Sequence, residues 1–243
     1  MNHAFIMTCR MSFLGVIQAQ AQARPLFDTV FGIDPTQAKQ DLRAMVSSVN
    51  GEDANRRWSY AVSSQMDRLD IVQQAILDPL VDTAALRRLQ PVSEVINAFV
   101  DRLLAQFAEL PWVAPRIAVG CVARWSMADI AAANAALLRQ FPGLPVRASD
   151  QDIVFRRNQP AVLALGGNEM RCNRIATWQT ARSIVVAVGT QARTVSHQHV
   201  VLAETDCSSD QDRTDALGVE AGVPLLRALA AETIQLLPNE IAP

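Results

Sequence analysis

The chain has 243 residues, half of them hydrophobic, so it can build a sizeable core as one large domain or two small ones. Its 22 basic and 24 acidic residues give a formal net charge of −2, which provides no general attraction to nucleic acid or to a membrane. Lys39 is the single lysine, and neither a G-x-x-x-x-G-K-[ST] loop nor an H-E-x-x-H motif occurs. These absences argue against P-loop nucleotide hydrolysis and against the common zinc proteases.

Residues 1–24 are predicted to form an N-terminal arm. The run from Met11 to Ile17 is apolar and resembles a secretory signal peptide, but it is at the lower limit of length, so a docked arm is favoured. Apolar residues left in water would be a liability, so the arm is expected to dock on a partner or a symmetry mate. The predicted interface residues are Phe5, Phe13, Leu14 and Ile17.

Residues 25–127 are predicted to form a ferredoxin-like βαββαβ half. The segment 25–33 is expected to be a strand, and 34–46 a helix that starts at Asp34 and Pro35. In the ferredoxin-like order, two helices cover one face of a four-stranded antiparallel sheet. The remaining predicted elements are strands over 58–62 and 69–72, a short helix near 83–89, a long helix over 91–110 and a strand over 116–125.

Residues 128–243 are predicted to form an antiparallel, β-rich half with a C-terminal helix. A helix over 128–141 ends at Pro142-Gly143, and Gly166-Gly167 forms a turn. The last helix runs from Pro224 to about Leu237. The strands are expected at 152–156, 161–165, 170–178, 182–188 and 199–204.

Four cysteines are present, and none lies two or three residues from another, so no zinc or redox spacing exists. Cys121 and Cys172 fall in apolar strand patterns and are predicted to be buried thiols. This cysteine usage favours a cytoplasmic location.

The stretch from His197 to Asp212 raises the question of a metal site. On a strand, His199 and Asp206 are about 23 Å apart, and the histidines face away from Glu204 and Asp206, so they cannot share an ion. The acidic end alone offers Glu204, Asp206 and Asp210 as oxygen ligands for Mg²⁺, Mn²⁺ or Ca²⁺. The alternative is a strand end and turn whose polar side chains bond to nearby backbone, and no cofactor at all.

A second candidate site is an arginine-rich hairpin. Between Leu144 and His199 the chain has seven arginines against three acidic residues. Arg171, Arg174 and Trp178 place cations and an aromatic ring on one hairpin, as in proteins that bind single-stranded nucleic acid. The alternative is that these arginines pair with acidic residues across the sheet.

Four segments together resemble a sporadically distributed bacterial protein family with no assigned activity. They are 25–33, 116–122, 172–178 and 200–209. The family pattern has Asp-x-Asn-Thr after the acidic strand, where this sequence has Asp206-Cys207-Ser208-Ser209. The resemblance implies an architecture and transfers no catalytic residues.

These observations favour a non-catalytic binding or assembly protein. It would be a subunit or adaptor of a larger complex, or a self-associating scaffold, joined to a protein partner through its N-terminal arm and exposed strand edges. No segment approaches the length of a membrane-spanning helix. The alternatives are a divalent-metal-dependent hydrolase or nuclease and a single-stranded nucleic-acid-binding protein.

Overall fold

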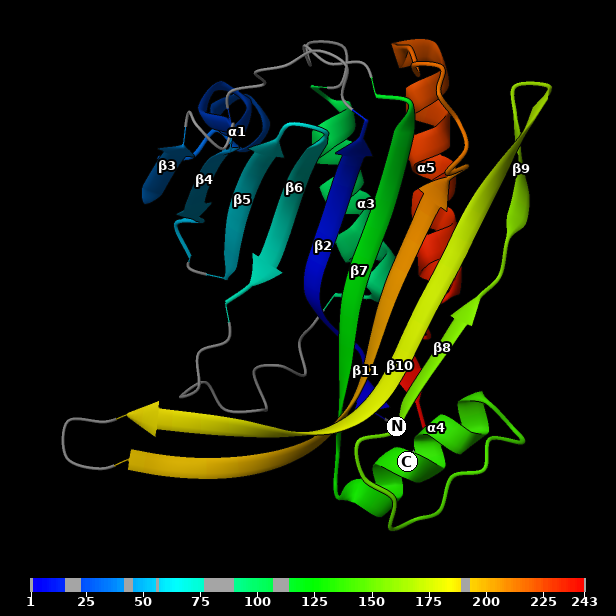
Figure 1. Ribbon diagram of the computed structural model, residues 1–243. Helices are drawn as coiled ribbons and strands as arrows, with labels where there is room; N and C mark the ends of the chain where they lie inside the picture. The colour runs from blue at the N-terminus through cyan, green and yellow to red at the C-terminus, as the bar shows by residue number, and fades with distance from the viewer. Residues whose placement is uncertain are drawn as a thin grey trace.

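A computed structural model describes residues 2–15, 23–41, 46–55, 57–76, 90–106, 114–188 and 193–242. Within these ranges, the side chains of residues 2, 3 and 183–196 are not described. The structure is an α+β fold built on a ten-stranded antiparallel sheet with the strand order β3-β4-β5-β6-β2-β7-β11-β10-β8 (Figure 1). Strand β9 also pairs with β10, and β1 and β12 form a separate two-stranded sheet. The α+β class and the large antiparallel sheet confirm the coarse prediction.

The first half of the chain supplies one side of the sheet. Its elements are β1 (Asn2–His3), β2 (Phe5–Leu14), α1 (Ala23–Phe31), β3 (Gln37–Asp41), β4 (Val46–Glu52), β5 (Trp58–Gln65), β6 (Arg68–Ala75) and α3 (Val92–Leu104). The predicted 58–62 and 69–72 hairpin and the long helix after Pro91 are confirmed. The predicted short helix near 83–89 lies outside the described residues.

The second half supplies the other side. Its elements are β7 (Arg116–Met127), α4 (Ile130–Gln140), β8 (Val154–Asn158), β9 (Ala161–Leu165), β10 (Asn168–Val188), β11 (Arg193–Ser209), α5 (Val219–Gln235) and β12 (Glu240–Ile241). The two predicted strands over 170–178 and 182–188 are one long strand, β10. Residues 182–188 of β10 and 193–198 of β11 pair with each other and with no other described strand. They leave the sheet as a two-stranded ribbon (Figure 1).

The two halves repeat one order of elements around the centre of the sheet. Apart from β3 in the first half and β9 in the second, the order β2-α1-β4-β5-β6-α3 is followed by β7-α4-β8-β10-β11-α5. In the sheet, the corresponding strands lie as β4-β5-β6-β2 and β8-β10-β11-β7. The first strands of the two halves, β2 and β7, pair antiparallel at the centre. The division predicted between residues 127 and 128 therefore falls after β7, whereas the repeat starts with β7.

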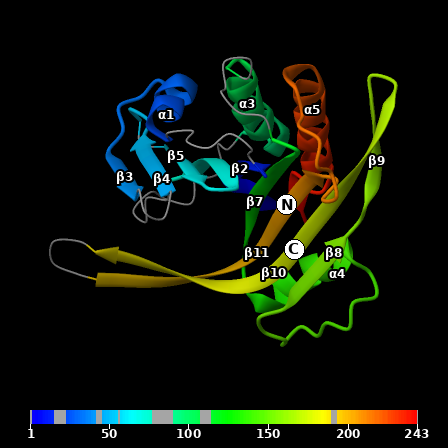
Figure 2. The ribbon, with the colours of Figure 1, turned by 45° about the horizontal axis from the view of Figure 1, so that its top comes forward.

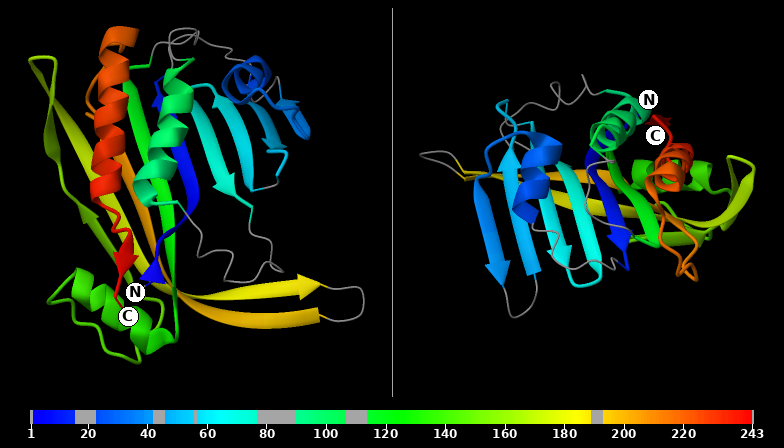
Figure 3. Two further views of the ribbon diagram at one scale, coloured as in Figure 1. Left: turned by 180° about the vertical axis from the view of Figure 1, so that it is seen from behind. Right: turned by 90° about the horizontal axis from the view of Figure 1, so that it is seen from above.

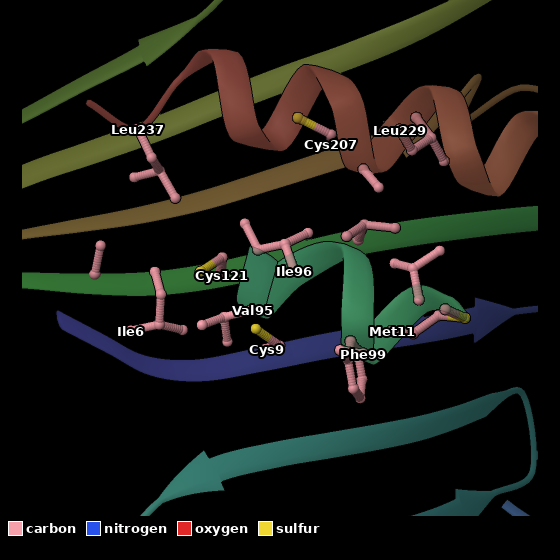
Figure 4. Close-up of a cluster of buried hydrophobic side chains, with 14 of the residues drawn as sticks. Ile6, Cys9, Met11, Val95, Ile96, Phe99, Cys121, Cys207, Leu229 and Leu237 are labelled. Carbon is pink, nitrogen blue, oxygen red and sulfur yellow. The ribbon is translucent and has the colours of Figure 1, made fainter. Parts of the chain in front are cut away.

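All four described helices lie on one face of the sheet (Figures 2 and 3). Helices α3 and α5 pack over the central strands, α1 packs on β4 and β5, and α4 packs on β10 and β11. Figure 4 shows the core that they cover, where side chains of β2, β7 and β11 meet α3 and α5. Trp125 of β7 and Trp178 of β10 stack within this layer with ring centroids 5.4 Å apart. The apolar alternation of the central strands thus faces the helices, and burying it is the main source of stability.

The ferredoxin-like half is not confirmed. Residues 23–31 form helix α1 and not a strand, and the predicted helix over 34–46 is replaced by strand β3 and the start of β4. Leu26, Phe27 and Val30 have helical spacing and are buried together. Gly32, with a φ of 60°, closes α1 by donating its N–H to the carbonyl of Asp28 at 3.0 Å. Asp34 and Pro35 therefore follow the end of a helix and do not start one.

The predicted N-terminal arm is wrong. Residues 5–14 form β2, which pairs with β6 and β7 at the centre of the sheet. Phe13 is 1% exposed, Phe5 and Leu14 are half-buried, and Ile17 lies outside the described residues. Cys9, Met11 and Phe13 alternate along this strand and are buried in the core.

All four cysteines are free and buried, as predicted for Cys121 and Cys172. Cys9 and Cys121 are directly opposite each other on β2 and β7. Burial raises the pKa of the Cys121 thiol well above its usual value and raises the pKa of the Cys207 thiol to about 12. Among the described residues, no helix is long and apolar enough to cross a bilayer.

Candidate functional site

The face of the sheet opposite the helices, called the open face below, carries no described helix (Figures 1 and 3). Through the centre of the sheet, each residue lies directly opposite a partner on the next strand, so the side chains on this face form continuous rows across the sheet. The central row is Gln37, Asn50, Ala61, Val72, Arg10, Gly120, Asp206, Ile175 and Asn158. With strands about 4.8 Å apart, this row of nine strands is about 38 Å long.

Two further rows flank the central row. One is Glu52, Ser59, Gln74, Thr8, Val122, Glu204, Thr177 and Arg156, and the other is Lys39, Ser48, Ser63, Asp70, Ser12, Ala118, Ser208 and Asn173. The three rows consist mainly of small, polar and charged residues, with the aliphatic side chains of Val72, Val122 and Ile175 and no aromatic side chain. Acidic and basic residues are interspersed, so the open face has no single sign of charge.

The centre of the open face is an ion pair that crosses a whole strand. Arg10 of β2 and Asp206 of β11 flank Gly120 of β7, and Nη2 of Arg10 lies 3.1 Å from Oδ2 of Asp206. A Cβ at position 120 would lie 3.1 Å from the carbonyl oxygen of Thr205 and 3.4 Å from Nη2 of Arg10. Gly120 therefore leaves the space in which Arg10 reaches the acid two strands away.

A second group of polar contacts lies beside this ion pair. The hydroxyl of Ser12 donates to Oδ1 of Asp70 at 2.5 Å, and Nε of Arg68 donates to Oδ2 of Asp70 at 2.6 Å. The hydrogen bond to Asp70 raises the pKa of Arg68, and the charge of Asp206 adds to the effect. The charges of the central strands are thus held in fixed positions by their neighbours.

A small hollow of about 40 Å³ opens beside the ion pair. It is lined by Thr8, Arg10, Gly120, Cys121, Val122, Glu204 and Thr205. Glu204 is exposed and lies across Val122 from Thr8. Together with Arg10, these side chains bring an acceptor, a hydroxyl and a cation to the lining of one hollow. This arrangement suits recognition of polar backbone and side-chain groups by hydrogen bonds.

The residues of the predicted metal site are not brought together. Glu204 and Asp206 share the open face, but Asp206 pairs with Arg10. Asp210 lies in the turn after β11, where its Oδ1 accepts from the backbone N–H of Asp212 at 3.0 Å. Across the described ranges, no group of three or more His, Cys, Asp or Glu side chains could hold one ion. The use of Mg²⁺ or Mn²⁺ stays a prediction.

The histidines are separated from the acids as predicted. Strand β11 is continuous over Arg193–Ser209, so His197 and His199 occupy the alternation of the helix-covered face. Glu204 and Asp206 occupy the opposite alternation. His197 is exposed and His199 is half-buried.

The residues of the predicted nucleic-acid site also do not share one surface. Trp178 is 2% exposed and packs between Trp125 and Phe141. Arg174 points to the helix layer, where its Nη1 pairs with Oε2 of Glu232 in α5 at 2.7 Å. Arg171 alone of the three is exposed, on the open face of β10. A base cannot stack on Trp178 in this fold, because both ring faces lie in the core.

The central residues Arg10 and Gly120 were missed by the sequence analysis. The signal is present in Thr8-Cys-Arg10-Met-Ser12-Phe, where polar and apolar residues alternate as in a half-buried strand. Interpreting 1–24 as an arm concealed it. The pairing of Arg10 with Asp206 has no sequence signal, because it depends on which strands are neighbours.

No family model matches the chain, and no curated protein or solved structure matches it either. The resemblance to a sporadically distributed bacterial family stays a prediction.

Proposed function

We propose that the chain is a non-catalytic binding or assembly protein that presents its open face to a protein partner. The observation that carries this proposal is the central row, which crosses nine strands without a described element on top of it. Small side chains such as Ala61 let a partner approach the sheet closely. The ordered charges around Arg10 and Asp206 fix its orientation.

The charge of the open face favours protein over nucleic acid as the partner. A surface for phosphates needs an excess of cations. Here Arg10 is paired with Asp206, so it is not free for a phosphate. In the flanking rows, two cations, Lys39 and Arg156, stand against three acids, Glu52, Asp70 and Glu204, so cations are not in excess. We place the protein in the cytoplasm, since four buried free thiols fit a reducing compartment.

The proposal is tested by adding the same side chain to two positions. Ala61→Arg places a bulky cation in the central row, and Ala221→Arg places it on the exposed start of α5. Tagged wild type and both variants are purified from the source cells, and co-purifying proteins are quantified by mass spectrometry. We expect a protein bound by the wild type and by Ala221→Arg to be lost from Ala61→Arg. Equal recovery with all three chains would contradict the proposal.

A further inference from the structure

The two edges of the ten-stranded sheet differ in character. The edge strand β3 reads Gln-Ala-Lys-Gln-Asp, and all five of its residues are exposed. Polar and charged edge strands of this kind prevent pairing with other chains. The opposite edge consists of β8 and β9, which pair with consecutive parts of β10. Strand β9 reads Ala-Val-Leu-Ala-Leu and contains no polar side chain, and Val162 is 57% exposed. Among the described strands, β9 pairs with β10 alone.

The backbone of β9 is prepared to accept another strand. Gly166 and Gly167, both with positive φ, form a two-residue hairpin loop that is closed by the Leu165–Asn168 pair. The closing pair of such a hairpin is hydrogen-bonded, so Ala161, Leu163 and Leu165 bond toward β10. Val162 and Ala164 therefore direct their backbone N–H and C=O groups to the outer edge.

We propose that β9 pairs antiparallel with β9 of a second copy of this chain. This edge is separate from the open face, so the inference goes beyond the proposed function and names one partner for the edge. Centred on Leu163, the two strands place Val162 opposite Ala164 of the second copy, and Ala164 opposite its Val162. Both pairs consist of outward-directed backbone groups, so each contributes two hydrogen bonds across the twofold axis. The sheet then continues from one copy into the other.

Charge complementarity supports the second copy as the occupant. On the open face of β10, Arg171 stands beside Val162, and Glu169 stands beside Ala164. In the proposed register, each row across the junction has Arg171 of one copy at one end and Glu169 of the other copy at the opposite end. The backbones at these two positions are about 14 Å apart by strand spacing. The long Arg171 and Glu169 side chains can extend over Val162 and Ala164, so their charged ends come closer than the backbones. Because β9 itself is uncharged, pairing two copies brings no like charges together.

The proposal is tested by sedimentation velocity of the whole chain from micromolar to millimolar concentration. We expect the wild type to dimerise reversibly and Ala164→Pro to remain a monomer. Proline at position 164 removes an N–H that points away from β10, so every hydrogen bond between β9 and β10 remains. The monomer should therefore keep its fold, and circular dichroism checks this. The variant Ala221→Arg controls for a surface change and should dimerise as the wild type does.

A charge exchange tests the register without changing the backbone. With Glu169→Arg, both ends of each row across the junction carry an arginine. This repulsion should weaken the dimer roughly threefold or more at low salt. The double variant Glu169→Arg with Arg171→Glu restores opposite charges and should recover wild-type association. A monomeric wild type, or a dimer unchanged by Ala164→Pro and by Glu169→Arg, would overturn the inference. Loss of a partner protein by Ala61→Arg together with a monomeric wild type would overturn the dimer and leave the proposed function standing.

Discussion

The two faces of this sheet are made by the same strands, yet their side chains are kept in place by different interactions. In β7, Ile117, Val119 and Cys121 point to the helices and are at most 2% exposed. The alternate positions 116, 120 and 124 carry Arg, Gly and Arg on the open face. The covered face is held by apolar burial, and the open face by local ion pairs and hydrogen bonds. A single residue step along β7 therefore moves a side chain from the helix-covered face to the open face.

The largest contrast is expected from two neighbours on β6. Ile71 is 0% exposed under the helices, whereas Val72 lies in the central row. Ile71→Ala should lower the free energy of unfolding by about 2–5 kcal/mol, because it leaves a cavity in the core. Val72→Ala should cost under about 1 kcal/mol. Urea denaturation measures both, and equal costs would show that the two faces are not distinct.

The next effect is expected where the open face is closely packed. Gly120→Val would place a branched side chain against the carbonyl of Thr205, which belongs to an interior strand and cannot move away. We expect a loss of roughly 1–3 kcal/mol and displacement of Arg10 from Asp206. Val122→Ile, two residues along the same face, is the control and should change stability by less than about 0.5 kcal/mol. Thermal denaturation distinguishes the two, and similar melting temperatures would contradict the tight contact.

The covered face should also show a dependence on alkaline pH. The pKa of Cys207 is about 12 in the folded chain against a usual 9.0, because burial disfavours the thiolate. A raised folded pKa means that its contribution is complete below pH 9 and is lost as pH rises toward 12. The slope from this thiol is at most about 1.4 kcal/mol per pH unit. Cys207→Ala should reduce the slope measured by denaturation between pH 9 and 11, and an unchanged slope would contradict a buried thiol.

The smallest effect on stability is expected at the charged centre of the open face. The Arg10 and Asp206 side chains are 33% and 35% exposed, so solvent screens their attraction. Asp206→Asn should cost under about 1 kcal/mol, and less in high salt. Asp101→Asn, which removes the more exposed pair with Arg227, is the control and should cost still less. A loss of several kcal/mol from Asp206→Asn would mean that this pair holds the fold together.

The sequence alone predicts those elements whose apolar spacing is unambiguous. The stripe of α3 and the alternation of β7 were both identified, as were the Gly166-Gly167 turn and β9. The segment 25–33 failed because its short apolar run fits either a strand or a helix, and the Gly32 cap decides between them. The arm failed because a central strand near the terminus resembles a targeting segment.

The candidate site was less accessible to prediction than the fold. Periodicity correctly separated His199 from Asp206, since it needs only the alternation of one strand. It could not show that β2 lies two strands from β11, so the partner of Asp206 was not found. The grouping of Arg171, Arg174 and Trp178 on one hairpin offered Trp178 as a candidate for a binding surface, although the alternation of β10 turns this ring toward α4 and the core. Long-range pairing and the choice of face are set by tertiary packing.

The central claim is that the open face acts as one binding surface across both halves of the chain. The most direct test is co-purification with Ile175→Arg, which lies in the second half of the central row about five strand spacings, or roughly 24 Å, from Ala61. We predict that Ile175→Arg loses the same partner protein as Ala61→Arg, while both variants keep the wild-type melting temperature. Retention of that partner by Ile175→Arg at wild-type level would contradict the claim.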